Sequence, residues 1–324
     1  MHGCQRSNAR VASVATDTRT LGKATESAHR VVVSGISGLV GRELAHQLAV
    51  AGVDVLGLTR RELSTIAPFS FPVRLYRLDG NTQYLVDLFQ DMRPDTVIHL
   101  AAQAQRNHST ADVRAFIEAN SLVGTQLLEA ARLSDCRRFI TAESILQFSD
   151  TGKYQPYNLY AATKQAFADL LLYYTDAFDI SAIALVLPTI YSEYETLPKL
   201  MTDITSSVLN NSVLNLYTDD VQIDFMHVED IARAFVRAAA LLDNPADAKK
   251  GSLTRYCVSS GADITPPELV GLFEQIAEKK ITVQRHPLQA TTRRVRPWRG
   301  PILPGWSPQI NLETGIKRML SRPR

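Results

Sequence analysis

Cysteine is scarce in this chain of 324 residues: Cys4, Cys136 and Cys257 lie far apart and form no CxxC or Cys/His pattern. Such a sequence offers neither a disulfide framework nor a zinc site, and it suits a reducing, cytoplasmic compartment. Long apolar runs are also lacking, because the longest, Ile231–Leu242, is interrupted by two arginines. We therefore expect no membrane span. The formal net charge of +2 excludes the strongly basic surface of a protein that coats nucleic acid.

The first segment, residues 1–29, is rich in Ser, Thr, Ala and Arg and has no apolar periodicity. A basic composition poor in acids is typical of a transit peptide, whereas the lack of any apolar pattern is typical of a disordered extension. We favour the disordered extension. The segment also lacks the apolar core of a secretory signal.

From Arg30 onward, short apolar runs alternate with longer amphipathic stretches. This alternation predicts βαβ units and a parallel sheet with helices on both faces, the doubly wound α/β (Rossmann) fold. The predicted strands are Arg30–Ser34, Asp54–Leu58, Val73–Leu78, Thr96–Leu100, Phe139–Ala142 and Ser181–Leu187. The principal helices between them are predicted at Gly38–Ala51, Val113–Leu133 and Asn158–Ala177.

After residue 187 the pattern changes, because turn residues become frequent and the apolar runs become shorter. Helices are predicted near Lys199–Leu209, Glu229–Leu242 and Pro266–Lys279. We therefore expect a dinucleotide-binding domain over residues 30–187. Residues 188–324 are expected to form a smaller, mixed substrate-binding lobe that is interleaved with the last elements of the sheet.

A glycine-rich turn follows the first predicted strand and opens the first helix. It reads Gly35-Ile36-Ser37-Gly38-Leu39-Val40-Gly41. Glycine lets the backbone turn tightly and approach a pyrophosphate, which then sits on the amides of the helix N-terminus. A tight strand-to-helix turn also favours glycine for steric reasons alone. The position of the motif at the start of the fold favours nucleotide binding.

The end of the second predicted strand indicates which nicotinamide cofactor is bound. An acidic residue there would accept hydrogen bonds from the adenosine ribose and favour NAD(H). This chain has Thr59, Arg60 and Arg61 instead, and guanidinium groups attract a 2′-phosphate through charge-assisted hydrogen bonds. We therefore expect a preference for NADP(H), with NAD(H) possible if the arginines form only a solvated loop. Asp79 could accept a hydrogen bond from the adenine amino group.

The most specific local pattern is Tyr160-Ala-Ala-Thr-Lys164. On a helix, residues four apart share a face, so the ammonium group is expected beside the phenol and a bound nicotinamide ribose. A nearby cation favours the phenolate and should lower the tyrosine pKa from about 10 toward neutrality. Tyr160 could then exchange a proton with a carbonyl or alcohol oxygen. Ser144, at the end of the preceding strand, could bond the same oxygen, or it could merely cap a turn.

In the order of its motifs the sequence resembles the NAD(P)-dependent epimerase/dehydratase family, the extended short-chain dehydrogenases that act on nucleotide sugars. The likeness runs from Val31 to about Lys317, and the GxxGxxG spacing is the form that these enzymes use. Besides the motifs above, the matching segments are Pro94–Ala102, Asn120 with Gly124-Thr125, Ile190-Tyr191, Asp224–Asp230, Gly305–Pro308 and Glu313–Ile316.

The resemblance implies roles for individual residues. Tyr160 would be the acid/base, Lys164 would hold the nicotinamide ribose, and Ser144 would contact the sugar oxygen. Further cofactor contacts are implied at Leu100, Ala101, Ala102 and Pro188. Substrate contacts are implied at Gln103 and Thr189 and at an arginine of the 285–299 segment, for which we take Arg296. The resemblance also implies a homodimer formed through the helices 113–133 and 158–177.

Departures from the family's pattern narrow the reaction. Members that eliminate water typically have acidic residues after the catalytic hydroxyl, where this chain has Ile145 and Leu146. Glu143 precedes Ser144 and would serve only in a shifted alignment. Reductases that also epimerise have a cysteine at the position of Leu146. A dehydratase and a dual epimerase-reductase are therefore disfavoured. Thr189 stands where the family usually has Asn, and Phe148 stands where Tyr is common.

Three functions are compatible with these residues. The leading hypothesis is an NADP(H)-dependent reductase that converts a nucleotide-linked 4-keto-6-deoxyhexose to the alcohol. The alternative is a nucleotide-sugar 4-epimerase that reuses a tightly bound NAD. The third is a nucleotide-sensing protein with a vestigial site, which the intact Tyr160 and Lys164 disfavour. No metal, nucleic acid or membrane partner is expected.

Overall fold

The central sheet begins with the first apolar run of the described chain. In the computed structural model, which describes residues 29–105, 107–149, 151–217, 221–244, 250–286 and 297–322, β1 (Arg30–Ser34) is buried from its second residue onward. It pairs in parallel with β2 (Asp54–Thr59) and with β4 (Thr96–His99). The N-terminal extension predicted over residues 1–29 lies, apart from His29, outside the described residues.

Seven strands form this sheet in the order β10-β6-β5-β4-β1-β2-β3, and each pair of neighbours is parallel. The other four are β3 (Arg74–Arg77), β5 (Arg138–Ser144), β6 (Ser181–Leu187) and β10 (Leu253–Cys257). The order reverses between β1 and β4, and ligands of doubly wound sheets bind at the carboxyl ends of the strands beside such a reversal. The predicted fold class is confirmed.

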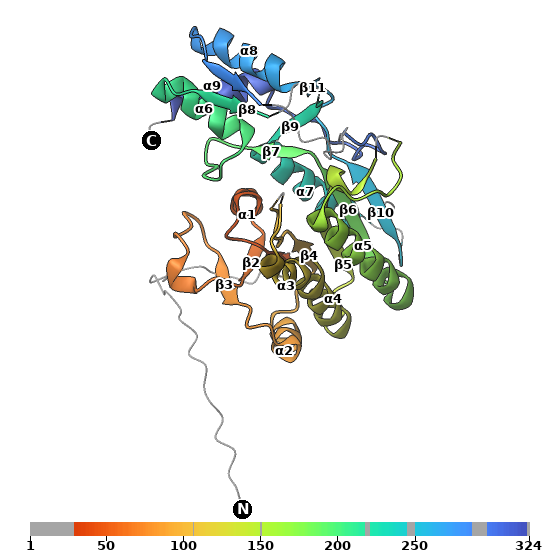
Figure 1. Cartoon of the computed structure of the whole chain (residues 1–324). Helices are drawn as coiled ribbons and strands as arrows, with labels where there is room; N and C mark the ends of the chain where they lie inside the picture. The colour runs from red at the N-terminus through yellow and green to blue at the C-terminus, as the bar shows by residue number, and fades with distance from the viewer. Residues whose placement is uncertain are drawn as a thin grey trace, which may run out of the picture.

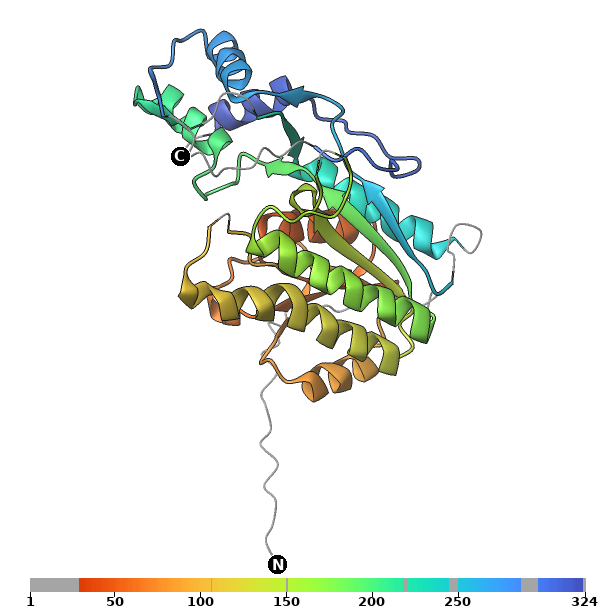
Figure 2. The same cartoon turned by 45° about the vertical axis from the view of Figure 1, so that its right-hand side comes forward.

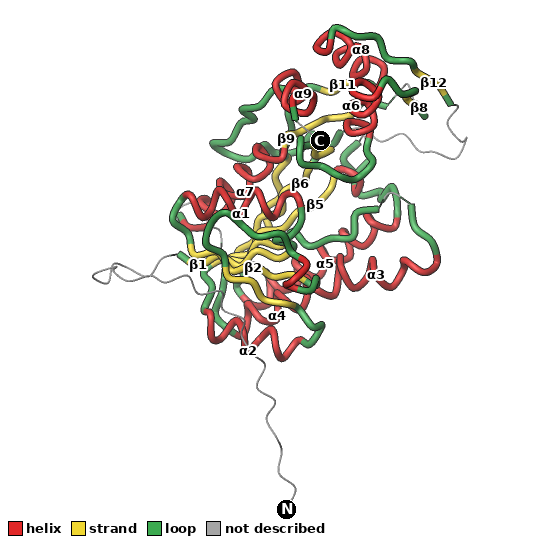
Figure 3. Tube along the Cα trace, turned by 90° about the vertical axis from the view of Figure 1, so that its left-hand side faces the viewer, coloured by secondary structure: helices red, strands yellow, loops and turns green. Residues whose placement is uncertain are grey.

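Helices cover both faces of the sheet, as Figure 3 shows. On one face α1 (Leu39–Val50) packs against α7 (Val228–Asp243). The other face carries α2 (Thr82–Met92), α4 (Val123–Leu133) and α5 (Leu159–Phe178). Among the described residues, no helix is both long enough and apolar enough to cross a membrane.

The helix predicted over residues 113–133 is one run of three segments. A π-helical turn at Glu118–Leu122 separates α3 (Val113–Ile117) from α4. This turn carries Asn120, which is fully buried. Its Oδ1 accepts a hydrogen bond from the Gln103 backbone N–H (2.7 Å), and its Nδ2 donates to Thr163 Oγ1 (2.9 Å). The turn thereby ties the loop after β4 to helix α5.

Beyond β6 the chain forms a second group of elements, drawn above the main sheet in Figures 1 and 2. The strands β7 (Thr189–Tyr191), β9 (Ile223–His227) and β11 (Asp263–Ile264) form a mixed sheet, and β8 (Leu214–Leu216) pairs with β12 (Val283–Arg285). Three helices share an apolar core with these strands: α6 (Leu200–Asn210), α8 (Pro266–Ala277) and α9 (Leu312–Ser321). The same half of the chain also supplies α7 and β10 to the main body.

Asp230, in the first turn of α7, fastens the C-terminal segment to the body. It is fully buried, and its carboxylate accepts hydrogen bonds from the backbone N–H groups of Gln309 (2.7 Å) and Ile310 (2.9 Å). Arg233 also forms an ion pair with this carboxylate. Because a buried charge is costly unless it is paired and hydrogen-bonded, these contacts specify one position for the segment that leads into α9.

Candidate active site

The turn between β1 and α1 has the geometry that a phosphate-binding loop requires. Gly35 has a φ of +74°, a backbone conformation that residues with a side chain rarely adopt. A Cβ atom added to Gly35 would lie 2.7 Å from the backbone nitrogen of Ala101. A Cβ on Gly41 would overlap the carbonyl oxygen of Gly35. Glycine at these two positions therefore permits both the turn and the close approach of the helix to β1 and β4.

The N-terminus of α1 suits an anionic ligand. Its N-cap, Gly38, supplies no side-chain hydrogen bond, and the first turn of the helix contains no acidic residue. The amides of this twelve-residue helix thus face the turn without a competing anion of its own, and its dipole favours a pyrophosphate there. A dinucleotide cofactor fits this end of the site.

We expect Gly41→Ala to weaken both folding and cofactor binding, because the new methyl group overlaps the Gly35 carbonyl. Overpacking of this kind costs about 1–3 kcal/mol of unfolding free energy, which denaturant titration measures. Gly271→Ala is the matched control, since a Cβ on Gly271 in α8 meets no atom within 4 Å. Equal effects of the two substitutions would contradict the assignment of the turn.

The residues expected to discriminate between NADP(H) and NAD(H) lie at the end of β2, outside the cavity described below. Thr59 is buried, and its Oγ1 accepts a hydrogen bond from the Arg61 backbone N–H (3.1 Å) and lies 3.4 Å from Ser37 Oγ. The side chains of Arg60 and Arg61 are exposed. Asp79 uses its Oδ1 to accept from the backbone N–H of Asn81 (2.8 Å). Thr59 therefore shapes the loop that presents the two arginines.

Ser144 ends β5 and has two contacts that correspond to the two roles considered for it. Its hydroxyl accepts a hydrogen bond from the Leu146 backbone N–H (3.2 Å), which caps the short 3₁₀ turn Ile145–Gln147. The same hydroxyl acts to lower the pKa of the phenol of Tyr160, the second residue of α5, and so lies near it. Ser144 is therefore a turn cap whose hydroxyl also faces the proposed acid/base.

The expected lowering of the Tyr160 pKa is wrong for this structure. Burial of the phenol raises its pKa to about 12, and the hydrogen bond from Ser144 lowers it only in part. Lys164 does not act on this pKa in the structure, because its Nζ donates to the Ala142 carbonyl oxygen (2.9 Å) instead. Removal of the hydroxyl from water outweighs the local hydrogen bond, so Tyr160 is a protonated phenol at neutral pH.

Lys164 is almost fully buried, at 1% exposure. Burial lowers its pKa to about 8, while the carboxylate of Glu143 acts in the opposite direction. An ammonium group with a pKa near 8 is still mainly charged at neutral pH, and Lys164 could hold a hydroxyl-bearing ligand beside Ala142.

The carboxylate of Glu143 forms an ion pair with an arginine on another strand. Its carboxylate is 3% exposed and binds both Nε and Nη2 of Arg255 on β10, at 2.5 and 2.9 Å. Two charge-assisted hydrogen bonds hold this carboxylate in one orientation, directed at Arg255. The shifted alignment in which Glu143 serves as the acid of an elimination is therefore not supported by its contacts.

One cavity of about 640 Å³ brings most of the predicted residues together. Those that line it are Gly35, Ser37, Gly38, Leu39, Val40, Gly41, Leu100, Ala102, Ser144, Tyr160, Lys164 and Pro188. Ala101 and Gln103 alternate with its lining residues, and Thr59, Arg60, Arg61 and Asp79 also lie outside it. Arg296 falls outside the described residues.

Sequence reasoning overlooked the segment after β7 that closes this cavity. Tyr194, Glu195, Thr196, Leu197 and Lys199 all line it. A loop has no hydrophobic periodicity from which it could be predicted. The only sequence signal for its role was its position after a strand that ends beside the site.

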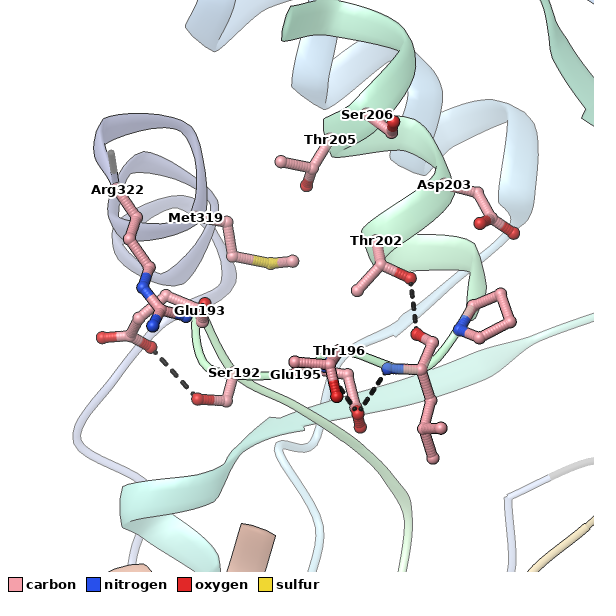
Figure 4. Close-up of a pocket in the computed structure, with 12 residues that line it drawn as sticks. Ser192, Glu193, Glu195, Thr196, Thr202, Asp203, Thr205, Ser206, Met319 and Arg322 are labelled. Carbon is pink, nitrogen blue, oxygen red and sulfur yellow. Dashed lines mark hydrogen bonds between the residues drawn. The ribbon is translucent and has the colours of Figure 1, made fainter. Parts of the chain in front are cut away.

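Two further cavities adjoin this segment in the second group of elements, beyond β6. The larger, of about 880 Å³, is lined by Thr189 and shares Glu195, Leu197 and Lys199 with the first cavity, so the segment lies at their junction. Figure 4 shows the smaller, of about 520 Å³, between the segment, α6 and α9. There Glu195 accepts hydrogen bonds from the backbone N–H groups of Thr196 and Leu197, both at 3.0 Å. These bonds fix the carboxylate at the base of the segment.

His227 belongs to a group of residues that resembles a metal site, but its members are hydrogen-bonded or ion-paired with neighbouring protein groups. One ligand atom from each of His227, Glu193 and Glu229 lies within 4.8 Å of the others. The imidazole Nε2 donates to Glu193 (2.9 Å), its Nδ1 accepts from the Glu229 backbone N–H (3.3 Å), and Arg318 pairs with the Glu229 carboxylate (2.7 Å). These groups satisfy one another, so the arrangement is structural.

Comparison with known proteins identifies the family. The sequence profile of the NAD dependent epimerase/dehydratase family matches residues 31–251. The chain belongs to this family. The match covers the glycine turn, Ser144, Tyr160 and Lys164, and it ends just before β10.

Individual relatives of the chain are named for different activities. The chain is 24% identical over 305 residues to a CDP-abequose synthase of Salmonella typhimurium, covering 90% of this chain and 97% of that protein. It is 26% identical over 312 residues to a UDP-glucose 4-epimerase of Mycolicibacterium smegmatis, covering 89% and 96%. Among solved structures, MoeE5 in complex with UDP-glucuronic acid and NAD is similar in fold, with a TM-score of 0.77, 22% identity and coverage of 90% and 97%.

Proposed function

We propose that the protein is an NADP(H)-dependent reductase that converts a nucleotide-linked 4-keto-6-deoxyhexose to the corresponding alcohol. A nucleotide-sugar substrate is supported by the names of the relatives, which include a CDP-abequose synthase and a UDP-glucose 4-epimerase. The observation that carries the proposal is that Ser144, Tyr160 and Lys164 line the same cavity as the glycine turn.

The protonation state of Tyr160 suits a reduction. With a pKa of about 12 the phenol carries its proton at neutral pH and can act as the general acid. A nicotinamide cofactor bound in this cavity would supply the hydride that the carbonyl carbon of the sugar accepts. Tyr160 then gives its proton to the carbonyl oxygen, while the Ser144 hydroxyl donates a hydrogen bond to the same oxygen and stabilises the developing charge. Lys164 holds the ribose of the cofactor.

The groups needed for an elimination are lacking at the expected positions. Ile145 and Leu146 follow Ser144 and cannot move a proton, and Glu143 is bound to Arg255. The preference for NADP(H) is supported by the exposed side chains of Arg60 and Arg61 at the end of β2.

The proposal is tested by mixing the purified protein with NADPH and a 4-keto-6-deoxyhexose nucleotide and following the loss of NADPH absorbance. Consumption of one NADPH for each alcohol formed supports the reductase. A protein that retains NAD through purification and interconverts two sugar nucleotides without net cofactor consumption would instead be an epimerase. This alternative is supported by the relative of the chain that is named as a UDP-glucose 4-epimerase.

We also propose that the protein is a homodimer formed through the helices α3, α4 and α5, which run side by side in Figure 2. Their outer surface exposes large apolar side chains, among them Ile117 (48%), Leu122 (47%) and Tyr173 (57%). Exposed apolar side chains gathered on neighbouring helices are typical of a protein–protein interface.

We expect Ile117→Asp combined with Tyr173→Asp to convert the dimer to a monomer, because two buried unpaired charges per subunit are costly in an apolar interface. Light scattering should then give the chain mass of 35.9 kDa in place of twice that value. Val50→Asp on α1, which is 76% exposed, is the control and should leave the mass unchanged. A wild-type protein that is monomeric at all concentrations would contradict the proposal.

A further inference from the structure

Glu143 is a buried carboxylate in the strand that carries the active-site serine, and its side chain faces helix α5. Side chains alternate across a strand. Phe139, four residues earlier on β5, packs against Phe167 of α5, with ring centroids 6.2 Å apart. Glu143 therefore projects to the same side of the sheet, the side from which Lys164 reaches the Ala142 carbonyl oxygen.

Few ionisable groups act on the Lys164 ammonium. His99 on β4 lies on the same side, but burial lowers its pKa to about 3, so it is neutral. Tyr160, on the same helix, is a protonated phenol. Of the charged groups in the described part of the chain, Glu143 is the one that raises the pKa of Lys164, against the effect of burial. Removing Glu143 would therefore leave the desolvation of Lys164 without compensation.

Arg255 holds this carboxylate in place. Its guanidinium binds both oxygens of Glu143, and it lies 5.7 Å from the ring centroid of Phe148. Bidentate pairing fixes the direction of the carboxylate as well as its charge. Its positive charge also opposes that of Lys164, so the two members of the pair act on Lys164 with opposite sign.

We propose that Glu143, held by Arg255, is a positioning residue that keeps the Lys164 ammonium charged and seated on the Ala142 carbonyl, ready to bind the cofactor ribose. This inference rests on the proposed function only through the role of Lys164 in cofactor binding. It gives a role to a buried carboxylate that lines the cavity and is paired with an arginine.

The test measures how the affinity for NADPH and for NADH depends on pH, in the full-length protein, by calorimetry around pH 8. NADH is included because it lacks the 2′-phosphate, which titrates on its own. In the wild type, the affinity should fall as the pH rises through the pKa of Lys164, about 8, because the neutral amine is a poorer donor.

The variants should move this midpoint in opposite directions. Glu143→Gln removes the stabilising anion and leaves Arg255 unpaired, so the midpoint should drop by about one pH unit, a tenfold loss of affinity above it. Arg255→Met leaves the carboxylate unopposed and should raise the midpoint. The double variant should fall between the two single variants. Glu129→Gln, which breaks an ion pair with Arg132 on α4, should not move the midpoint.

A merely structural ion pair predicts a different pattern. The single variants would then unfold at lower temperature, the double variant would recover stability, and all midpoints would coincide with that of the wild type. Coinciding midpoints, or a wild-type affinity that does not change with pH, would overturn the proposal. If Glu143→Gln does not fold, the upward shift in Arg255→Met decides the question. No sugar nucleotide is used, so failure of the proposed reduction is detected separately.

Discussion

Tyr160→Phe should lower turnover by a factor on the order of 10² to 10⁴, the usual contribution of a general acid. The substitution keeps the aromatic ring and removes only the phenolic hydroxyl, which carries its proton at neutral pH because its pKa is about 12. Cofactor affinity should barely change, because the phenol is not expected to anchor the nicotinamide. The measurement is kcat from NADPH absorbance together with the dissociation constant of NADPH.

Two further variants separate this mechanism from a loss of packing. Tyr154→Phe, at a tyrosine that is 49% exposed, should leave turnover near the wild-type value. Lys164→Met should weaken cofactor binding and turnover together, because it removes the ribose contact as well as the ammonium charge. A Tyr160→Phe protein that reduces the keto sugar at nearly the normal rate would refute the assignment of the acid.

Replacing Arg60 and Arg61 together by Ala should weaken NADPH far more than NADH. Each lost charge-assisted hydrogen bond to the 2′-phosphate costs about 1.5–3 kcal/mol, so the ratio of the two dissociation constants should change by at least a hundredfold, or about 2.7 kcal/mol. NADH should be little affected because it lacks that phosphate. Titrating both cofactors into the same variant measures the ratio directly.

A remote arginine provides the control for charge alone. Arg137, next to β5 at the opposite end of that strand from Ser144, pairs with Asp135, and its replacement by Ala should alter neither affinity. Equal weakening of NADPH and NADH in the Arg60/Arg61 variant, or a wild-type preference for NADH, would show that these arginines are only a solvated surface.

Much of the fold could be predicted because the parallel strands are buried on both faces and are therefore continuous apolar runs. β1 and β6 illustrate this, and their predicted bounds agree with the structure. β10 could not be recognised in the same way. Its sequence, Leu-Thr-Arg-Tyr-Cys, mixes polar and apolar residues because the strand lies at the edge of the sheet, where burial is partial.

The candidate site could likewise be predicted only in part: residue spacing indicated which side chains come together, but not the environment in which they lie. Ser144, Tyr160 and Lys164 could be placed in one site because helical spacing and strand ends locate them. The direction of the Tyr160 pKa shift was predicted wrongly, since desolvation depends on packing that a spacing does not contain. Likewise, the pairing of Glu143 with Arg255 joins residues 112 positions apart, and no local pattern indicates such a pair.

The position of β10 has a consequence for the order of folding. The strand that it covers, β6, is buried at every residue, and its partner β10 is made only after the whole of α6 and α7 has been synthesised. Until then β6 is an apolar edge with unpaired backbone groups, the kind of surface that recruits other chains. We therefore expect the β6 edge to stay open to other chains until residues 253–257 have emerged and paired with it, and a chaperone that binds extended apolar segments would act before that point.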